Sequence, residues 1–95
     1  MVTEIAIFTA IPGKEEALGQ GIIQGLDAIR QHPQCISANT TRCIERPERY
    51  MLSVIWTSAE AHINGFRNGP LYPKWRSSIN DLFEGSAEVF HYQPY

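Results

Sequence analysis

The sequence predicts an α+β fold in which one antiparallel sheet is built in the order β-α-β-β-α-β. Four runs of residues are rich in β-branched, aromatic and aliphatic side chains, and the stretches after the first and third of them change to a helical period. A short connection, residues 46–49, joins the second and third β-rich runs and makes them a hairpin. With 95 residues and no linker, repeat or low-complexity segment, the chain is expected to form a single domain over residues 1–95.

The first half of the chain is predicted to supply one strand and one long helix. Residues 3–11 form a run that ends at Pro12-Gly13 and is apolar on both faces, so this strand is expected to be covered on each side. Residues 14–32 change to a helical period and place four aliphatic side chains on one face, namely Leu18, Ile22, Leu26 and Ile29. Pro33 ends this helix.

Three glycines interrupt the expected first helix, at positions 19, 21 and 25. Each of them destabilises a helix by about 0.8–1 kcal/mol relative to alanine. They indicate the close approach of another backbone or a pocket that needs room, although a helix of low intrinsic stability has the same pattern.

The second and third strands are expected at residues 35–45 and 50–56, with Pro47 in a favoured position of the turn between them. Alternate residues of the third strand are large and share one face: Tyr50, Leu52, Val54 and Trp56. The second strand is mixed, and one of its faces carries Ile36, Ala38, Thr40, Arg42 and Ile44. Its other face has only small and polar side chains, which suits a border with solvent, a partner chain or a polar ligand.

The second helix is expected in two pieces. Thr57 and Ser58 both offer a helix cap, Thr57 with Glu60 fits a capping box, and the first piece runs to about Arg67. After a break at Asn68-Gly69-Pro70, the second piece ends at a C-terminal cap formed by Gly85 and places one stripe on its inner side: Tyr72, Trp75, Ile79 and Leu82. Residues 87–93 are predicted to form the fourth strand, with Val89 and His91 on one face and Phe90 and Tyr92 on the other.

This order of elements is the ferredoxin-like pattern, in which the helices cover one face of the sheet. Several strands are apolar on both faces, so the uncovered face also needs a partner. We expect a homodimer in which that face packs, sheet to sheet, against the same face of a second copy.

The composition and net charge of the chain exclude some classes of binding partner and indicate the cellular compartment in which it is expected. A net charge of -2 supplies no basic field for nucleic acid or for an anionic membrane surface. No signal peptide is recognisable, and no apolar run approaches the ~20 residues that span a bilayer. Cys35 and Cys43 fall in one expected strand, roughly 26 Å apart, which excludes a disulfide between them. A cytoplasmic protein with reduced cysteines is expected.

Three stretches resemble one protein family. They are Pro12-Gly13-Lys14-Glu15-Glu16 at the start of the first helix, His32-Pro33-Gln34-Cys35 before the second strand, and Trp56-Thr57-Ser58-Ala59-Glu60-Ala61-His62. Together with the order and length of the elements, they resemble the antibiotic biosynthesis monooxygenase family over nearly the whole chain. The Trp-x-Ser-x-Glu-Ala piece is the most specific, and His-Pro-Gln-Cys departs from the more usual Pro-Gly-Cys.

The resemblance implies a homodimeric α/β barrel with a cavity in each subunit between the sheet and its helices. Catalytic members of the family oxidise polycyclic phenols or quinols with dioxygen and use no cofactor, whether metal, flavin or haem. Other members degrade haem, and the residues which that branch requires are replaced here by Ala6, Gly65 and Trp75. The resemblance therefore implies a cofactor-independent monooxygenase acting on an aromatic, phenolic or quinol-type small molecule.

Cofactor-free oxidation needs a proton acceptor beside an aromatic, water-poor pocket. His62 is the first catalytic candidate, because Phe66 lies four residues further on the same helical face and Tyr72 follows across the break. Tyr72 is the second catalytic candidate because of its hydroxyl. The candidates for binding substrate are Asn39, Phe66, Trp75, Arg76 and His91.

Each candidate has a structural alternative. His62 and Arg76 could lie on solvated helix faces, and Tyr72 and Trp75 could fill the core. Asn39 could lie at a dimer seam or a sheet edge, and His91 could be a structural histidine. His32, His62 and His91 are too dispersed in the sequence to indicate a metal site. A non-catalytic dimeric binding or stress-related module, or a polyketide cyclase, remains the alternative function.

Overall fold

Four strands and three helical segments follow one another in the predicted order, with the second helix split in two. The computed structural model describes residues 1–95. Its strands are β1 (Val2–Thr9), β2 (Cys35–Arg42), β3 (Arg49–Trp56) and β4 (Glu88–Tyr92), and its helical segments are α1 (Glu15–Arg30), η1 (Ala61–Phe66) and α2 (Leu71–Ser77). None of these helices is long and apolar enough to cross a lipid bilayer.

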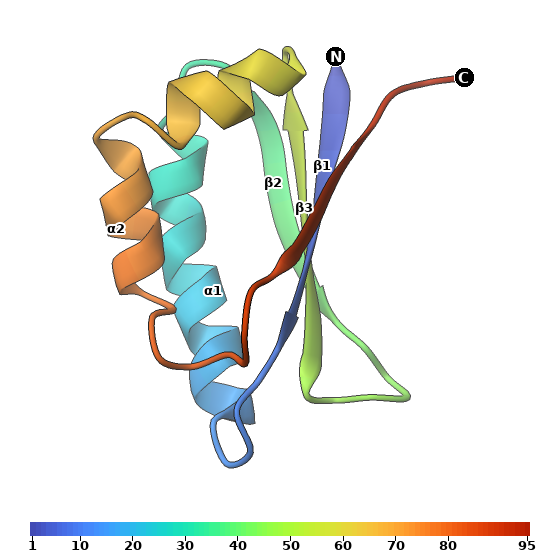
Figure 1. Cartoon of the computed structure of the whole chain (residues 1–95), viewed down its shortest axis with the longest axis vertical. Coiled ribbons are helices and arrows are strands. Elements are labelled where there is room, and N and C mark those ends of the chain that lie inside the picture. The colour runs from blue at the N-terminus through green and yellow to red at the C-terminus, as the bar shows by residue number, and fades with distance from the viewer.

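The strands form one sheet in the order β2-β3-β1-β4, and every neighbouring pair is antiparallel. This is the ferredoxin-like arrangement that the order of elements predicted. All the helical segments lie on one side of the sheet, and the other side is bare (Figure 1). β1 occupies a central position, where a strand that is apolar on both faces is expected.

The core fills the space between the helices and the covered face of the sheet. The aliphatic face of α1 is buried as predicted, and so are the alternate residues of β3 that begin with Tyr50. β1 contributes Ala6 and Phe8, and the residue one step earlier on the same face is Glu4, a buried carboxyl group. An apolar layer therefore surrounds one ionisable group at the covered face of the central strand.

The glycines of α1 mark close approaches rather than a pocket. A Cβ atom at Gly21 would overlap the backbone carbonyl of Ser78, and one at Gly25 would lie 2.5 Å from the ring of Trp75. A Cβ atom at Gly19 would lie 2.5 Å from the hydroxyl of Tyr50. Close approach of another backbone is therefore confirmed at Gly21, whereas Gly19 and Gly25 make room for side chains.

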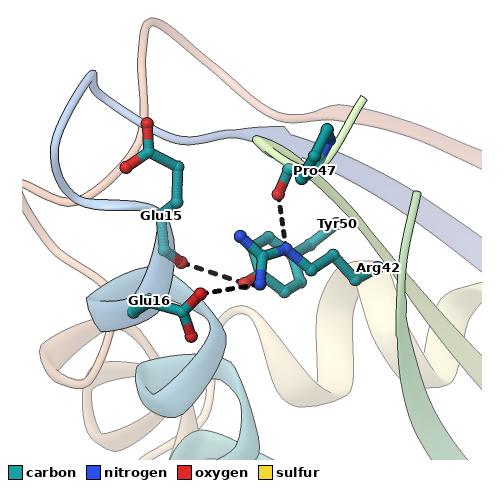
Figure 2. Close-up of polar contacts among 5 residues, drawn as sticks. All are labelled: Glu15, Glu16, Arg42, Pro47 and Tyr50. Atoms are coloured by element: carbon teal, nitrogen blue, oxygen red, sulfur yellow. Dashed lines mark hydrogen bonds and ion pairs between the residues drawn. The ribbon is translucent and has the colours of Figure 1, made fainter. Parts of the chain in front are cut away.

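The first turn of α1 is tied to the β2–β3 hairpin by polar contacts (Figure 2). The Tyr50 hydroxyl donates a hydrogen bond of 2.9 Å to the carbonyl of Glu15. Arg42 donates to the Glu16 carboxylate at 2.8 Å and to the carbonyl of Pro47 at 2.6 Å, and its guanidinium lies 5.3 Å from the centre of the Tyr50 ring. These contacts fix one end of the helical layer over the sheet.

The predicted capping box at the start of the second helix is wrong. The Ser58 hydroxyl, not that of Thr57, accepts a hydrogen bond of 3.1 Å from the backbone N–H of Ala61. The N–H of Thr57 instead donates to the carbonyl of Gln34 at 3.1 Å, which holds Thr57 against the turn before β2. The helix consequently starts one residue later than the Thr57–Glu60 spacing suggested.

The predicted continuation of the last helix to Gly85 is also wrong. α2 ends at Ser77, and the following residues bond to the end of β1: Ile11 N–H donates to Leu82 at 3.1 Å and Glu84 N–H donates to Thr9 at 2.7 Å. Ile79 still reaches the core, but from a turn. Gly85 has φ 57° in the connection to β4 and does not cap a helix.

The second strand is shorter and less regular than predicted. β2 ends at Arg42, so Cys43 lies beyond the strand, and both cysteines are free. A β-bulge between Cys35 and Ser37 breaks the alternation and leaves Ile36 55% exposed, although Ala38 is buried. The shared face that the sequence predicted for Ile36 and Ala38 is therefore not formed.

We expect Gly21→Ala to destabilise the protein by about 1–3 kcal/mol, because the added methyl group would push α1 away from the Ser78 carbonyl. In an open helix the same substitution would stabilise by up to about 1 kcal/mol. Gln24→Ala, at an exposed position of the same helix, is the matched control and should change stability little. Urea denaturation measures both variants, and a more stable Gly21→Ala protein would contradict the close approach.

Candidate active site

A cavity of about 280 Å³ lies between the covered face of the sheet and the η1–α2 segment. Its walls come from β1, β3, β4, η1, α2 and the connection between α2 and β4. Four of the predicted residues line it, His62, Tyr72, Trp75 and Arg76, and the structure adds Glu4 and Arg67. Its volume is at the lower end of the range for ligand pockets, about 300–1,000 Å³, and suits a small molecule.

Three ionisable side chains form a continuous polar chain beside this cavity, which we call the Glu4–His62–His91 chain. Glu4 is 5% exposed and His62 is 3% exposed. The indole N–H of Trp56 donates to Glu4 Oε1 at 2.9 Å, and His62 Nε2 lies 3.4 Å from the same oxygen. On its other side, His62 Nδ1 lies 2.8 Å from His91 Nε2. The buried carboxyl group thereby contacts groups from two further elements, β3 and η1, and His91 on β4 extends the chain.

The backbone explains how these side chains meet. Glu4 and His91 are directly opposite each other on the paired strands β1 and β4. The η1 segment is a π-helix, in which the N–H of Arg67 donates to the carbonyl of His62, five residues earlier, at 3.0 Å. The His62 ring stacks on Trp56, with ring centres 5.3 Å apart and 17° between the planes. Such wide helical turns occur frequently at functional sites.

Burial disfavours the charged form of all three side chains in this polar chain. It lowers the pKa of His62 to about 3, with further lowering by the positive charge of Arg67 and by His91 in its protonated form. Burial also lowers the pKa of His91, and Arg67 adds to this effect. Burial raises the pKa of Glu4, while the Trp56 hydrogen bond and Arg67 partly oppose the rise. Both imidazoles are neutral near pH 7, so the 3.4 Å contact between His62 and Glu4 is a polar contact and not an ion pair.

A second polar group on the cavity wall is built from Arg76 and Tyr72. Arg76 Nη1 donates to the Tyr72 hydroxyl at 3.2 Å, and the guanidinium lies 5.5 Å from the centre of the Phe83 ring. Arg76 Nε is buried without a hydrogen-bond partner. Neither Arg76 nor Arg67 forms an ion pair with a carboxylate. The cavity thus presents unneutralised positive charge beside an aromatic wall.

The structure brings together all the predicted site residues except Asn39. Phe66 packs edge to face on Tyr72 at 5.7 Å and lies behind the cavity wall, and His91 joins the site through His62. Asn39 is exposed and pairs with Ser53 on the bare face of the sheet, so it cannot orient a ligand in this cavity. The reason is strand alternation: its neighbour Ala38 takes the buried side.

Two of the three histidines that are far apart in the sequence lie together in the structure. His62 and His91 are in direct contact, whereas His32 lies apart from the polar chain and packs edge to face on Trp56 at 5.5 Å. His62 also does not lie on a solvated helix face, which was its structural alternative, because its side chain is buried.

Sequence reasoning missed Glu4 as a site residue and gave Arg67 too little weight. Glu4 is a lone carboxylate in an otherwise apolar run, in phase with Ala6 and Phe8. That phase places Glu4 on the covered face of the sheet. Burial of an ionisable group is costly, and such groups are frequent at functional sites. Arg67 resembles any charged residue at the end of a helix, so nothing in the pattern singles it out.

The geometry agrees with the family suggested by the sequence motifs. The family model for antibiotic biosynthesis monooxygenase matches residues 1–78. The chain belongs to this family. Membership supports a monooxygenase-like function in general terms and leaves the substrate open.

Relatives of this family member cover almost its entire length. The uncharacterized protein YczJ of Bacillus subtilis is 27% identical over 93 residues, which make up 98% of each chain. A solved structure from Bordetella bronchiseptica, provisionally assigned to the antibiotic biosynthesis monooxygenases, is 29% identical with a TM-score of 0.92, over 99% of this chain and 96% of that one. A similarly assigned structure from Nitrosomonas europaea shares the fold, with 17% identity and a TM-score of 0.81, over 99% of this chain and 98% of that one.

We expect His62 to make the stability of the protein depend on pH. Because its pKa is about 3 in the folded chain and 6.5 for the ordinary side chain, its neutral form favours folding above pH 6.5. This contribution is lost as the pH falls from 6.5 towards 3. The free energy of unfolding of the wild type relative to His62→Gln should therefore decline over that range. Urea denaturation at several pH values measures it, and a difference independent of pH would contradict the burial of a neutral His62.

Proposed function

We propose that this protein is a monooxygenase that acts, without a bound metal, flavin or haem, on a small electron-rich phenol or quinol held in the cavity. The observation that supports this proposal is the buried Glu4–His62 pair on the wall of a cavity that also offers aromatic rings and unpaired arginines. The cavity volume suits a ligand of one or two fused rings.

The chemistry requires one proton acceptor and dioxygen. Loss of a proton from an O–H or an acidic C–H group leaves an electron-rich anion, which reacts with dioxygen. For an activated CH₂ group the balance is CH₂ + O₂ → C=O + H₂O. The carbon supplies all four electrons, so no external reductant is needed. The protein has to bind the substrate, accept its proton and exclude water.

The predicted residues take the following roles in this proposal. Arg76 and Tyr72 form a hydrogen-bonded pair that is suited to hold a phenolic oxygen and to stabilise its negative charge. Trp75 forms part of the aromatic wall, and Phe66 supports Tyr72 from behind. His62 belongs to the buried pair that handles the proton. Asn39 has no role in this site.

A non-catalytic binding module is the second candidate. It is favoured by the low pKa of His62, which makes the imidazole a weak base on its own. Such a module would bind a small aromatic anion through Arg76 and would consume no oxygen. A polyketide cyclase would also abstract a proton without consuming oxygen. Oxygen uptake therefore separates the leading proposal from both alternatives.

We also propose the homodimer expected from the sequence. Proteins of this family are typically dimeric. The bare face of the sheet carries large apolar side chains that are at least partly exposed: Ile5, Ile7, Met51, Ile55 and Phe90. Packing this face against a second copy would remove them from water and would form the barrel.

The cytoplasmic location expected from the sequence also stays a proposal. Both cysteines are free thiols, and they suit a reducing compartment. Fractionation of the native cells tests it.

We expect the purified protein to consume dioxygen with at least one of two bicyclic compounds, 2-tetralone and 1,4-dihydroxynaphthalene. His62→Ala should lower kcat about 10²–10⁴-fold, because the proton-handling pair is broken. Tyr72→Phe should raise KM, because Arg76 loses its hydroxyl partner at the oxygen site. His32→Ala and Tyr92→Phe, which lie outside the cavity lining, are the matched controls. No turnover by the wild type, or turnover unaffected by His62→Ala, would contradict the proposal.

We expect a combined Ile5→Glu and Phe90→Glu substitution to convert the dimer into a monomer. These residues are directly opposite each other on β1 and β4, on the bare face, so two carboxylates there would meet the same charges of the partner. Ile44→Glu changes an equally apolar residue that is 89% exposed outside the sheet, and it should leave the dimer intact. Light scattering after size-exclusion chromatography measures the mass, and an unchanged mass would exclude this interface.

A further inference from the structure

The Glu4–His62–His91 chain leads from the cavity wall towards the outside of the molecule. Glu4 and His62 line the cavity, whereas His91 does not line it and is partly exposed. Glu4 is the only carboxylate on the cavity wall. Its Oε1 faces the donors Trp56 and His62, whereas its Oε2 has no hydrogen-bond partner in the protein and is not sealed from the cavity. The free oxygen is therefore the one available to a ligand.

We propose that Glu4 is the residue that accepts the proton from the substrate, and that His91 is a positioning residue that holds the His62 Nε2–H group towards Glu4. This assignment rests on the proposed function and decides which member of the buried pair carries the proton. Glu4 is a catalytic residue in this account because its carboxylate meets the reacting atoms. His62 and His91 act through Glu4.

The number of protons available along the chain determines the role of His91. Trp56 can only donate to Glu4 Oε1, and a neutral imidazole has one N–H group. Only one proton lies in the 2.8 Å contact between His62 Nδ1 and His91 Nε2. When His91 donates that proton, the single N–H of His62 is at Nε2 and points to Glu4 Oε1. The same carboxylate oxygen then faces two N–H groups, that of Trp56 in a hydrogen bond of 2.9 Å and that of His62 at the longer distance of 3.4 Å, and both stabilise its charged form.

His62 itself is poorly placed to accept the substrate proton. Both of its ring nitrogens are already engaged, Nε2 with Glu4 and Nδ1 with His91. Its pKa of about 3 leaves it no appreciable affinity for a proton near pH 7, whereas the pKa of Glu4 is raised by burial. Arg67 is the remaining charged group that acts on the chain, and from β2 the Cys35 thiol lies within the field of Glu4.

The proton balance closes within the cavity. The Glu4 carboxylate takes a proton from an O–H or an acidic C–H group, and the electron pair stays on the substrate. After dioxygen has added, the Glu4 carboxyl group returns the proton to the bound oxygen. It then takes the second proton from the carbon, and delivers it to the oxygen that leaves as water when the O–O bond breaks. Glu4 ends ionised, and His62 and His91 keep their protons throughout.

The first experiment measures proton abstraction without oxygenation. Under anaerobic conditions in D₂O, the wild-type protein should catalyse deuterium incorporation at the acidic CH₂ group of 2-tetralone, measured by NMR above the spontaneous rate. Glu4→Gln, which keeps the shape and an acceptor for Trp56, should lower this rate about 10²–10⁴-fold. Glu4→Asp should retain part of it. No exchange by the wild type, or exchange unaffected by Glu4→Gln, would overturn the assignment of Glu4.

The positioning role of His91 has its own test. Nitrogen NMR of the labelled wild type should show neutral His62 with its proton on Nε2 near pH 7. In His91→Leu this preference should be lost, and the acidic limb of the exchange rate should move to higher pH, because the Glu4 carboxylate loses an oriented donor. His91→Gln carries an amide N–H donor and should restore most of both properties. A wild-type His62 with its proton on Nδ1, or identical pH profiles in all three proteins, would overturn this role.

These tests separate the inference from the function on which it rests. If exchange depends on Glu4 but no oxygen is consumed, the oxygenase proposal fails and the assignment of the base stands. If oxygen is consumed equally well by Glu4→Gln, the oxygenase proposal stands and the assignment fails.

Discussion

A carboxyl group buried in the central strand is the constraint around which one end of this molecule is arranged. Glu4 is surrounded by an apolar layer, and an unsatisfied carboxyl group there would cost several kcal/mol. The donors come from Trp56 at the end of β3 and from His62 on η1, and His91 on β4 completes the contact. The end of β3 at Trp56, the wide turn of η1 at His62 and the pairing of β4 with β1 bring these groups to Glu4 and allow it to remain buried. The wide turn of η1 is one result, since it places the His62 ring flat on Trp56.

The order of elements and the covered face could be predicted because they depend on local patterns. Alternation in β3 and the helical stripe of α1 were sufficient to identify their buried residues. The errors occurred where long-range contacts decide the local structure. Thr57 resembles a helix cap but is held by Gln34, and the residues after Ser77 bond to the end of β1 instead of extending a helix. Neither partner is visible from the neighbouring sequence.

Several residues that line the cavity could be predicted, whereas their contacts could not. The spacing of His62, Phe66 and Tyr72 identified one side of the cavity, with His62 and Tyr72 in its wall and Phe66 behind it. Glu4 and His91 come from opposite ends of the chain, and only the antiparallel pairing of β1 with β4 places them together. The role suggested for His62 depended on an ordinary histidine pKa, which burial removes. Asn39 does not line the cavity, because strand alternation places it on the bare face of the sheet.

The contact between Gly21 and the carbonyl of Ser78 has a consequence for how this scaffold can change its ligand. With no side chain between α1 and the turn after α2, the spacing of the helices is as small as the backbones allow. α2 carries Tyr72, Trp75 and Arg76, so this spacing also sets the position of the cavity roof over the sheet. Substitutions in α1 can therefore change the size of the ligand that the cavity accepts, although these residues do not contact the ligand. Relatives with a larger residue at this position would be expected to accept bulkier molecules through an unchanged set of polar groups.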